Sequence, residues 1–247
     1  MGARRRLDAE LVRRGLATSR AEAVDAVTAG RVLVNGAVAD KAARLVAPGD
    51  AVTVSDPPAR FVGRGGEKLD AALDHFAIDV AGRRWLDVGA STGGFTDCLL
   101  SRGARAVVAL DVGHGQLHPR LRNDPRVLVL ERTNVRAATL DTIDGAAEGV
   151  VVDVAFISLR TIIPVLVTLC QPGAPMVLLV KPQFEAGRAE VSRGRGVVTD
   201  PGVHERVRGE IDAALVAAGC AVHGWIDSPL LGGHGNRELL VHATSPA

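Results

Sequence analysis

Short apolar runs alternate with longer stretches of helical character from about residue 63 onward. This alternation is typical of an α/β fold, in which helices cover both faces of a mostly parallel sheet. It predicts seven strands, at residues 84–88, 106–110, 127–130, 149–153, 175–180, 220–223 and 238–242. It also predicts helices at residues 94–102, 157–169 and 202–218, and a mobile loop in the Gly- and Arg-rich residues 187–196.

The first sixty residues predict a separate, smaller α+β unit. Leu7 and Leu11 lie on one apolar helical face. Ser19 and Glu22 form a capping box, in which each side chain satisfies a free amide at the start of a second helix. The Asn-Gly pair at residues 35–36 then predicts a hairpin turn.

Residues 56–58 (DPP) break both patterns, because proline restricts its own backbone and that of the residue before it. We expect a first domain at residues 1–59, a short linker at 60–65 and a second domain at 66–247. Residues 1–62 carry ten Lys or Arg against seven Asp or Glu, whereas residues 63–247 carry 19 against 21. The basic N-terminal part favours an anionic partner such as nucleic acid, although a solvated basic face explains the charge nearly as well.

The composition excludes several classes of protein. With 47% hydrophobic and 23% charged residues, the chain is typical of a globular protein and not of a disordered one. It has no apolar run of the roughly 18 residues that a membrane span needs and no signal peptide, so a cytoplasmic protein without membrane contact is expected. Three widely spaced cysteines suit reduced thiols. No CxxC occurs, and His114 with His118 lacks a third ligand, so no metal site is predicted.

The string LDVGASTGGFT at residues 86–96 places an acidic residue in a strand, then a Gly-rich turn, then a helix. Ligands of open α/β sheets bind at this position, at the carboxyl end of a strand. The GxxxGG spacing differs from the GxGxxG of dinucleotide sites, and the string resembles the first motif of S-adenosylmethionine-dependent methyltransferases. Its glycines would let the backbone approach the cofactor closely.

Asp111 ends the next strand, where a carboxylate can accept hydrogen bonds from both ribose hydroxyls of an adenosyl group; capping of a helix is the structural alternative. Asn134 follows the third strand and is expected beside the adenine. The resemblance thus implies an S-adenosylmethionine site formed by Asp87, Gly89, Ala90, Ser91, Thr92, Gly93, Gly94, Phe95, Asp111 and Asn134.

Only three of the 29 basic residues are lysines, namely Lys41, Lys68 and Lys181. Two of them fall at predicted element ends that also carry Asp153 and Glu238. The order Lys, Asp, Lys, Glu resembles the tetrad of FtsJ-like ribose 2′-O-methyltransferases. The coincidence is improbable if the lysines are placed at random, although chance explains Lys41 adequately.

The chemistry of such a tetrad follows from the substrate. A ribose hydroxyl is a poor nucleophile and must lose its proton as it attacks a methyl group. A lysine that is partly desolvated or set beside another cation can take that proton, whereas arginine cannot. We therefore expect Lys181 to be the base, Asp153 and Lys68 to tune it, and Glu238 to orient the target ribose.

Four strings of the N-terminal part are RLDAELVRRG at 6–15, SRAEA at 19–23, GRVLVNG at 30–36 and PGD at 48–50. Together they resemble the S4-like RNA-binding domain. The resemblance implies phosphate contacts, which dominate affinity for RNA but carry little sequence information, by Arg4, Arg6, Arg20 and Lys41. For any single Arg, a solvent-exposed helix position is an equally good explanation. In the second domain, contacts with RNA are expected from Arg64, Arg132, Arg136 and Arg188.

Further strings run through the second domain: RGGEKL at 64–69, DVGASTGGFT at 87–96, DVGHGQL at 111–117, LRNDPRV at 121–127, ERTN at 131–134, DVAFISL at 153–159, LVKPQFE at 179–185 and SPL at 228–230. With the N-terminal strings, they identify the chain as a member of the TlyA family, S4-domain rRNA methyltransferases also labelled hemolysin A. The resemblance implies S-adenosylmethionine-dependent 2′-O-methylation of cytidines in 16S rRNA, 23S rRNA or both. It also implies a Rossmann-like class I methyltransferase domain with seven strands, preceded by the small S4-like domain.

One position departs from the family pattern: Ala155 stands where the family often has Ser, which concerns local packing only. The chain has no Tyr and few Phe or Trp, so a flipped target base has few rings to stack on. Phe95, Phe156 and Phe184 are candidates, but each suits the core equally well.

Other functions compete with this interpretation. A non-catalytic RNA-binding factor of ribosome assembly could keep the fold without turnover, and the hemolysin label suggests a membrane-lytic protein, which the absence of a spanning or strongly amphipathic basic segment disfavours. A pseudouridine synthase could share the S4-like module but would not need the GxxxGG turn and Asp111. Ribosomal RNA or ribosomal subunits are the expected partner, and a monomer is expected.

Overall fold

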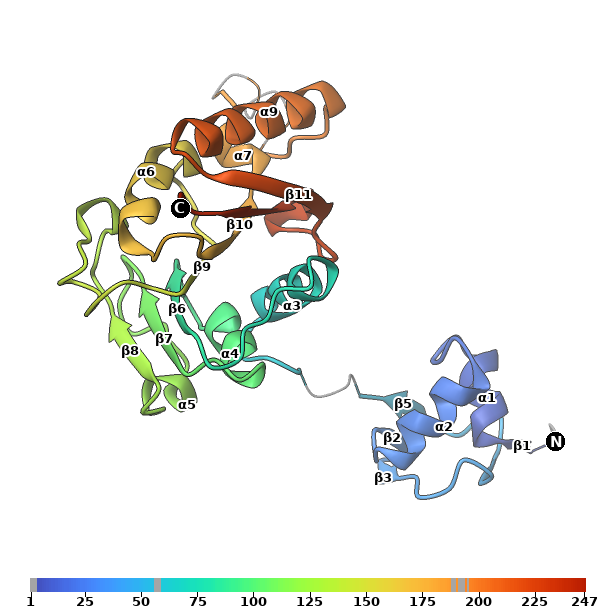
Figure 1. The fold of residues 1–247 in the computed structure, drawn as a ribbon. Coiled ribbons are helices and arrows are strands. Elements are labelled where there is room, and N and C mark those ends of the chain that lie inside the picture. Colours follow the sequence, from blue (N-terminus) through green and yellow to red (C-terminus); the bar gives the residue numbers. More distant parts are fainter. Residues whose placement is uncertain (1–3, 56–58, 188–189, 191–193, 195) are drawn as a thin grey trace. The chain divides into compact units, whose positions relative to one another are not determined.

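The computed structural model describes residues 4–55, 59–187, 190, 194 and 196–247. The expected break at residues 56–58, most of the expected loop at 187–196, and Arg188 lie outside the described residues. The chain forms two compact units, residues 1–59 and residues 60–247, which are coloured blue and teal to red in Figure 1.

The first unit combines helices with two small antiparallel sheets. Its described elements are β1 Arg5–Arg6, α1 Leu7–Arg13, α2 Arg20–Thr28, β2 Val32–Val34, β3 Ala37–Val38, β4 Leu45–Val46 and β5 Val52–Val54. One sheet has the strand order β3-β2-β5, and the other pairs β1 with β4. Leu7 and Leu11 of α1 pack on Ala23 and Val27 of α2 and on Val32, and together these side chains form the core of the unit.

Local signals explain where these elements begin and turn. Ser19 caps α2 by accepting the Glu22 N–H at 3.2 Å, as the sequence predicts. In a capping box the Glu22 carboxylate would accept the Ser19 N–H. Here it accepts the N–H of the preceding residue, Thr18, at 2.6 Å. Asn35 and Gly36 both have positive φ, which is the geometry of a type I′ turn joining β2 to β3.

The second unit is built on a seven-stranded sheet, and the predicted α/β fold class is confirmed. Its strands are β6 Arg84–Val88, β7 Ala106–Leu110, β8 Val127–Leu130, β9 Gly149–Val152, β10 Pro175–Val180, β11 Ala221–Asp227 and β12 Leu239–Thr244. The order is β11-β12-β10-β9-β6-β7-β8. β6 to β10 are mutually parallel, whereas β12 lies between β10 and β11 and runs antiparallel to both.

Alternate residues of the central strands serve the two faces of the sheet. Leu86 and Val88 pack with the helices α6 Leu159–Leu169 and α9 Pro201–Ala217, whereas Trp85 packs with α3 Gly65–His75 and α4 Gly94–Ser101. Figure 1 shows these two pairs of helices on opposite sides of the sheet. Burial on both faces explains why these strands are continuous apolar runs. Shorter elements are α5 Pro119–Arg122, η1 Val135–Ala137, α7 Pro182–Glu185 and η2 Gly233–Gly235.

Residues 60–65 do not form the expected linker. Phe61 is 3% exposed and packs in the core of the second unit with Leu69 of α3. The Val62 N–H donates to Asp97 Oδ2 at 2.8 Å, and α3 begins at Gly65. This short stretch therefore belongs to the second unit, because its aromatic side chain is buried against α3.

A half-buried histidine makes the stability of the second unit depend on pH. The ring of His242 in β12 packs between Phe76 and His223, with centroids 5.2 and 4.7 Å away. Burial, as the larger cause, and the neighbouring His223 together lower the pKa of His242 to about 4. Below about pH 6.5 the unfolded chain binds a proton that the folded chain binds only near pH 4, so stability falls as the pH falls through this window.

Replacing His242 with Phe is expected to flatten this dependence. Because the ring is partly exposed, we discount the effect to about 1 kcal/mol, which corresponds to a Tm loss between pH 7 and pH 4.5 that is smaller by roughly 2–4 °C. Thermal unfolding of both proteins across this range measures the difference. Parallel Tm profiles would show that another group causes the acid sensitivity.

Candidate active site

One edge of the seven-stranded sheet gathers three of the four residues of the predicted tetrad. Asp153 follows β9 and Lys181 follows β10, at the carboxyl ends of neighbouring parallel strands. Glu238 precedes β12, which runs the other way, so the start of β12 lies at the same edge. The ladder pairs Val180 with Leu239, and the next positions along it are Lys181 and Glu238. The fourth residue, Lys68, reaches this edge from α3.

The tetrad forms two ion pairs. Lys181 Nζ lies 2.5 Å from Asp153 Oδ1, and Lys68 Nζ donates to Glu238 Oε2 at 2.5 Å. The side chains of Lys68 and Glu238 are 10% and 3% exposed, against 14% and 23% for Lys181 and Asp153. Lys68 and Glu238 thus neutralise each other in a largely buried pair, and the roles expected of them, tuning Lys181 and orienting the ribose, stay predictions. Lys181 and Asp153 form the more open pair.

A cavity of about 220 Å³ opens beside the Lys181–Asp153 pair. The Gly-rich turn between β6 and α4 lines one part of it, and Asp153, Ala155 and Lys181 line another. The predicted cofactor residues in its wall are Gly89, Ala90, Ser91, Thr92, Gly94 and Phe95. The structure therefore brings most of the predicted cofactor site into contact with one half of the tetrad.

The glycines of this turn are required for packing within the protein. A Cβ on Gly89 would lie 2.3 Å from the carbonyl oxygen of Asp153, and one on Gly93 would lie 2.2 Å from Leu121 Cδ1. A Cβ on Gly94 would lie 2.9 Å from a backbone nitrogen of α3. The sequence-based explanation, close approach of a ligand, is therefore incomplete, because these glycines bring the turn against β9, α5 and α3. Gly93 itself is absent from the described cavity wall.

Asp87 lies beneath the turn and does not line the cavity. Its carboxyl group is fully buried and accepts the Thr96 hydroxyl at 2.6 Å, and its Oδ1 has no hydrogen-bond partner among the described residues. Burial raises the pKa of Asp87 to about 7, and the negative charge of Asp153 adds to this rise while the Thr96 hydrogen bond opposes it. In place of the predicted cofactor contact, Asp87 holds the first turn of α4.

Asp111 borders a smaller hollow next to Ser91. Its carboxylate accepts the Ser91 N–H at 2.8 Å and the Gly113 N–H at 2.6 Å, which fixes its orientation and leaves lone pairs for hydroxyl groups. Gln116 and Glu131 line the same hollow, and sequence reasoning missed both. Glu131 follows β8 directly, so its place at a strand end is the signal that could have revealed it.

Asn134 does not line either hollow among the described residues. Its side-chain oxygen accepts the Arg136 N–H at 3.0 Å and so caps η1. A residue that caps a short helix and one that binds adenine look the same in sequence, so the expected place of Asn134 beside the adenine stays a prediction.

Replacing Gly89 with Ala tests the packing of the turn. The positive φ of 84° costs a non-glycine residue about 1–2 kcal/mol, and the new Cβ would collide with the Asp153 carbonyl. We expect binding of S-adenosylhomocysteine to weaken at least tenfold in calorimetry, together with a lower Tm. Gly82→Ala is the matched control, because Gly82 also has positive φ but has open space at its Cβ. Equal losses in the two variants would show that backbone strain alone is responsible.

The predicted RNA contacts are exposed wherever the structure describes them. In the second unit these are Arg64, Arg132 and Arg136, and Arg188 lies outside the described residues. In the first unit they are Arg4, Arg6, Arg20 and Lys41.

Two of the arginines of the first unit also have a structural role. Arg6 and Arg20 bind the buried carboxylate of Asp8 at 2.8 and 2.9 Å, and their hydrogen bonds hold the pKa of Asp8 well below its usual range. Both guanidinium-bearing side chains are still more than half exposed, so the ion pairs orient them without hiding them.

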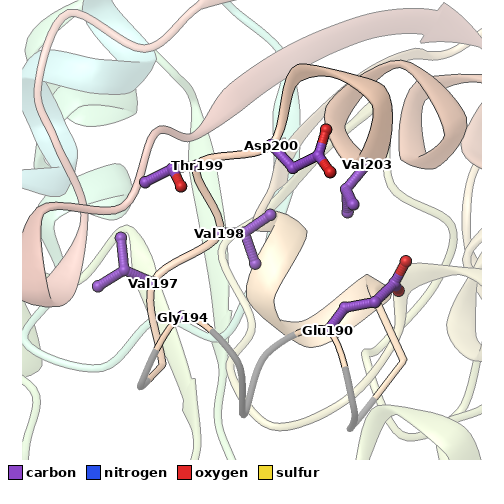
Figure 2. A pocket seen from close by; sticks show the side chains of 7 residues that line it. All are labelled: Glu190, Gly194, Val197, Val198, Thr199, Asp200 and Val203. Carbon is purple, nitrogen blue, oxygen red and sulfur yellow. The ribbon is translucent and has the colours of Figure 1, made fainter.

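A third hollow, of about 240 Å³, lies at the start of α9 (Figure 2). Valine side chains and the carboxylates of Glu190 and Asp200 line it. Asp200 caps α9 by accepting the Gly202 N–H at 2.8 Å, and Glu190 pairs with Arg206 at 2.6 Å. These carboxylates serve the fold, and the hollow shares no lining residue with the cavity beside Lys181.

Two features, a metal site and a membrane-spanning helix, are not found in the described part of the chain. No group of three or more His, Cys, Asp or Glu side chains there could hold a metal ion. Across the same residues, no helix is both long enough and apolar enough to cross a membrane.

Known families match both units. Residues 61–245 match the FtsJ-like methyltransferase family, and residues 5–52 match the S4 domain. The N-methyltransferase NodS from Bradyrhizobium japonicum, solved with S-adenosyl-L-homocysteine, shares the fold with a TM-score of 0.53 at 18% identity, covering 78% of this chain and 94% of that one. Fold and site thus define an FtsJ-like methyltransferase that carries an S4 domain.

Relatives that match nearly the whole chain show to which family within this class it belongs. The 16S/23S rRNA (cytidine-2′-O)-methyltransferase TlyA of Mycobacterium tuberculosis is 52% identical, covering 98% of this chain and 90% of that protein. The chain belongs to the TlyA family. Hemolysin A of Brachyspira hyodysenteriae is 39% identical, covering 96% of this chain and 98% of that protein. A solved structure of a proposed hemolysin from Streptococcus thermophilus has a TM-score of 0.74 at 40% identity, covering 98% of this chain and 89% of that one.

Proposed function

We propose that this chain is an S-adenosylmethionine-dependent methyltransferase that modifies the 2′-hydroxyl of cytidines in 16S rRNA, 23S rRNA or both. The observation that carries the proposal is the Lys181–Asp153 ion pair at the cavity lined by the Gly-rich turn. A lysine at this position provides the proton acceptor that a ribose hydroxyl needs before it can attack. The S4 domain and the rRNA-modifying relative support ribosomal RNA as the substrate.

The lining of the cavity suits S-adenosylmethionine. The turn at the start of α4 presents backbone close to the cavity from Gly89 to Thr92, and the Asp111 carboxylate borders the adjoining hollow. The turn would hold the amino-acid end of the cofactor, and Asp111 would accept hydrogen bonds from its ribose. When bound, the cofactor supplies an electrophilic methyl group.

The tetrad then accepts one proton from the substrate. In the ion pair with Asp153, Lys181 is an ammonium, so it has to release a proton to solvent before it can accept the proton of the target 2′-hydroxyl. Asp153, 2.5 Å from Lys181 Nζ, orients the amine and stabilises the ammonium that forms. Lys68 and Glu238 already neutralise each other, so they add no net charge to the site.

Phe156 offers an aromatic surface to the RNA. Its side chain is 91% exposed, and its ring packs against Phe184 with the centroids 5.1 Å apart. Its positive φ of 64° is a conformation that a bulky residue adopts only when its surroundings hold it there, and such positions cluster at functional sites. We propose that this ring stacks on a base of the substrate. Phe95, at 2% exposed, belongs to the core.

Phe156→Ala is expected to lower kcat/KM for ribosomal subunits about 5- to 100-fold, because base stacking on an aromatic ring contributes roughly 1–3 kcal/mol. Transfer of tritiated methyl groups measures the rate. Binding of S-adenosylhomocysteine should be unchanged, since the ring is not part of the described cavity wall. An unaltered kcat/KM would mean that the ring makes no contact with the RNA.

Mapping of ribose methylation tests the proposed function. The purified protein is incubated with S-adenosylmethionine and with ribosomal subunits from cells that lack the gene, and 2′-O-methylcytidine is located by mass spectrometry of rRNA fragments. We expect new modification in one or both rRNAs. Binding to subunits without any methylated ribose would instead identify an assembly factor, and leakage of dye from pure lipid vesicles would support lytic activity.

A further inference from the structure

Contacts at three places along the chain join the two segments that carry the Lys181–Asp153 pair. One segment leads from the end of β9 to the start of α6, and the other leads from the end of β10 through α7. In order along the chain, the contacts are Lys181 with Asp153 at 2.5 Å, Phe184 with Phe156 at 5.1 Å between ring centroids, and Glu185 with Ser158 and Leu159. The ion pair at one end is thus matched by a second polar contact at the other.

Glu185 makes this second contact with both carboxylate oxygens. Oε1 accepts the Leu159 N–H at 2.7 Å, and Oε2 accepts the Ser158 hydroxyl at 2.5 Å. The side chain is 2% exposed and lies at the start of α6, where free amides and the helix dipole favour a negative charge. Arg160 Nε, 3.5 Å from Oε2, supplies a compensating charge. A buried carboxylate with these partners is rigidly held.

The short helix α7 transmits this fixed position to Lys181. It is a single turn that begins directly after Lys181 and ends at Glu185. Its backbone is closed by the Phe184 N–H donating to the Lys181 carbonyl at 2.9 Å and by the Ala186 N–H donating to the Pro182 carbonyl at 2.8 Å. Since one closed turn separates the two side chains, a shift of Glu185 would move Lys181.

We propose that Glu185 is a positioning residue for methyl transfer. By holding α7 against the start of α6, its carboxylate keeps Lys181 Nζ in place against Asp153. The inference rests on the proposed role of Lys181 as the base. Glu185 acts through Lys181 and does not touch the substrate.

Three variants test this role. Glu185→Ala removes both hydrogen bonds and is expected to lower kcat about 10- to 100-fold, the effect of an error of about 1 Å in the position of a reacting group. KM for S-adenosylmethionine and for ribosomal subunits should change less than about threefold, because neither binding surface is altered. Glu185→Gln keeps an acceptor for the Leu159 N–H and a group that can bond to the Ser158 hydroxyl, so it should retain kcat within about threefold. Ser158→Ala removes one of the two hydrogen bonds of Glu185 without a change of charge. Its kcat is expected to lie between that of the wild type and that of a variant without both bonds, and it replaces Glu185→Ala if that variant does not fold.

Asp200→Ala is the matched control, because it also removes a carboxylate that caps a helix, here α9. Its loss lowers Tm through the missing helix cap and is expected to leave kcat unchanged when all proteins are assayed well below their Tm. The proposal is overturned if Glu185→Ala is no slower than Asp200→Ala, or if Glu185→Gln is as slow as Glu185→Ala.

Crystal structures of the wild type and of Glu185→Ala, or of Ser158→Ala in its place, separate this proposal from the proposed function. We expect the distance between Lys181 Nζ and Asp153 Oδ1 to increase in the variant. An unchanged distance would refute the positioning role whatever the activities are. If the wild type transfers no methyl group, the proposed function fails, and the structures alone then decide the role of Glu185.

Discussion

Arginine in place of Lys181 is expected to lower kcat for rRNA methylation about 10²- to 10⁴-fold, the usual contribution of a general base. A guanidinium group can still pair with Asp153, which lies 2.5 Å from the present amine, so the variant should fold. It cannot release its proton in a protein, and it therefore cannot accept one from a ribose hydroxyl. The expected result is a folded protein that binds both substrates and turns over very slowly.

Single-turnover transfer of a labelled methyl group to ribosomal subunits measures this effect. Calorimetry with S-adenosylhomocysteine shows whether the cofactor site survives the substitution. Arg105→Lys is a suitable control, because Arg105 lies before β7, away from the carboxyl edge of the sheet, and pairs with Glu148 at 2.7 Å. Near-normal turnover by the Lys181→Arg protein would rule out Lys181 as the base.

The second large effect concerns stability. Replacing Lys68 with Met leaves the carboxylate of Glu238 unpaired at 4% exposure, and breaking a buried ion pair in this way costs about 3–5 kcal/mol. For a unit of this size we expect Tm to fall by roughly 10 °C. Both tryptophans of the chain, Trp85 and Trp225, lie in the second unit, so their fluorescence reports on its unfolding alone.

The double variant Lys68→Met with Glu238→Gln removes both charges and should recover most of the lost stability, since the remaining groups no longer include an unpaired buried charge. Methylation should stay low, because the tetrad is not restored. Arg105→Met provides the comparison, as it breaks a pair whose Arg side chain is 60% exposed and should cost less than about 1 kcal/mol. Equal losses for Lys68→Met and Arg105→Met would mean that the Lys68–Glu238 pair contributes little to the fold.

Sequence predicts best those parts of the protein whose structure depends on a single physical rule. The bounds of β6, β7 and β10 follow from apolar runs buried on both faces, whereas β8 is a partly buried apolar run at the edge of the sheet. The strand ends place Asp153 and Lys181 together. β11 and β12 extend past their predicted ends, because the antiparallel ladder between them continues into polar residues, pairing Asp227 with Leu239 and Ala221 with Thr244.

Sequence could not show which lysine pairs with which carboxylate. That choice depends on the register of β12 against β10 and on Gly232, since a Cβ there would lie 2.0 Å from Glu238 Oε1. Nor does a motif distinguish a residue in a cavity wall from one beneath it. Asp87 and Gly93 belong to the predicted cofactor string, yet one supports α4 and the other packs on α5.

The place of β12 within the sheet also sets the order in which the protein becomes complete during synthesis. Residues 239–244 lie between β10 and β11, so the sheet stays open at β10 until they have left the ribosome. Lys68 cannot form its ion pair until Glu238, 170 positions further along the chain, has been synthesised. A growing chain therefore has its Gly-rich turn long before it has a neutralised tetrad.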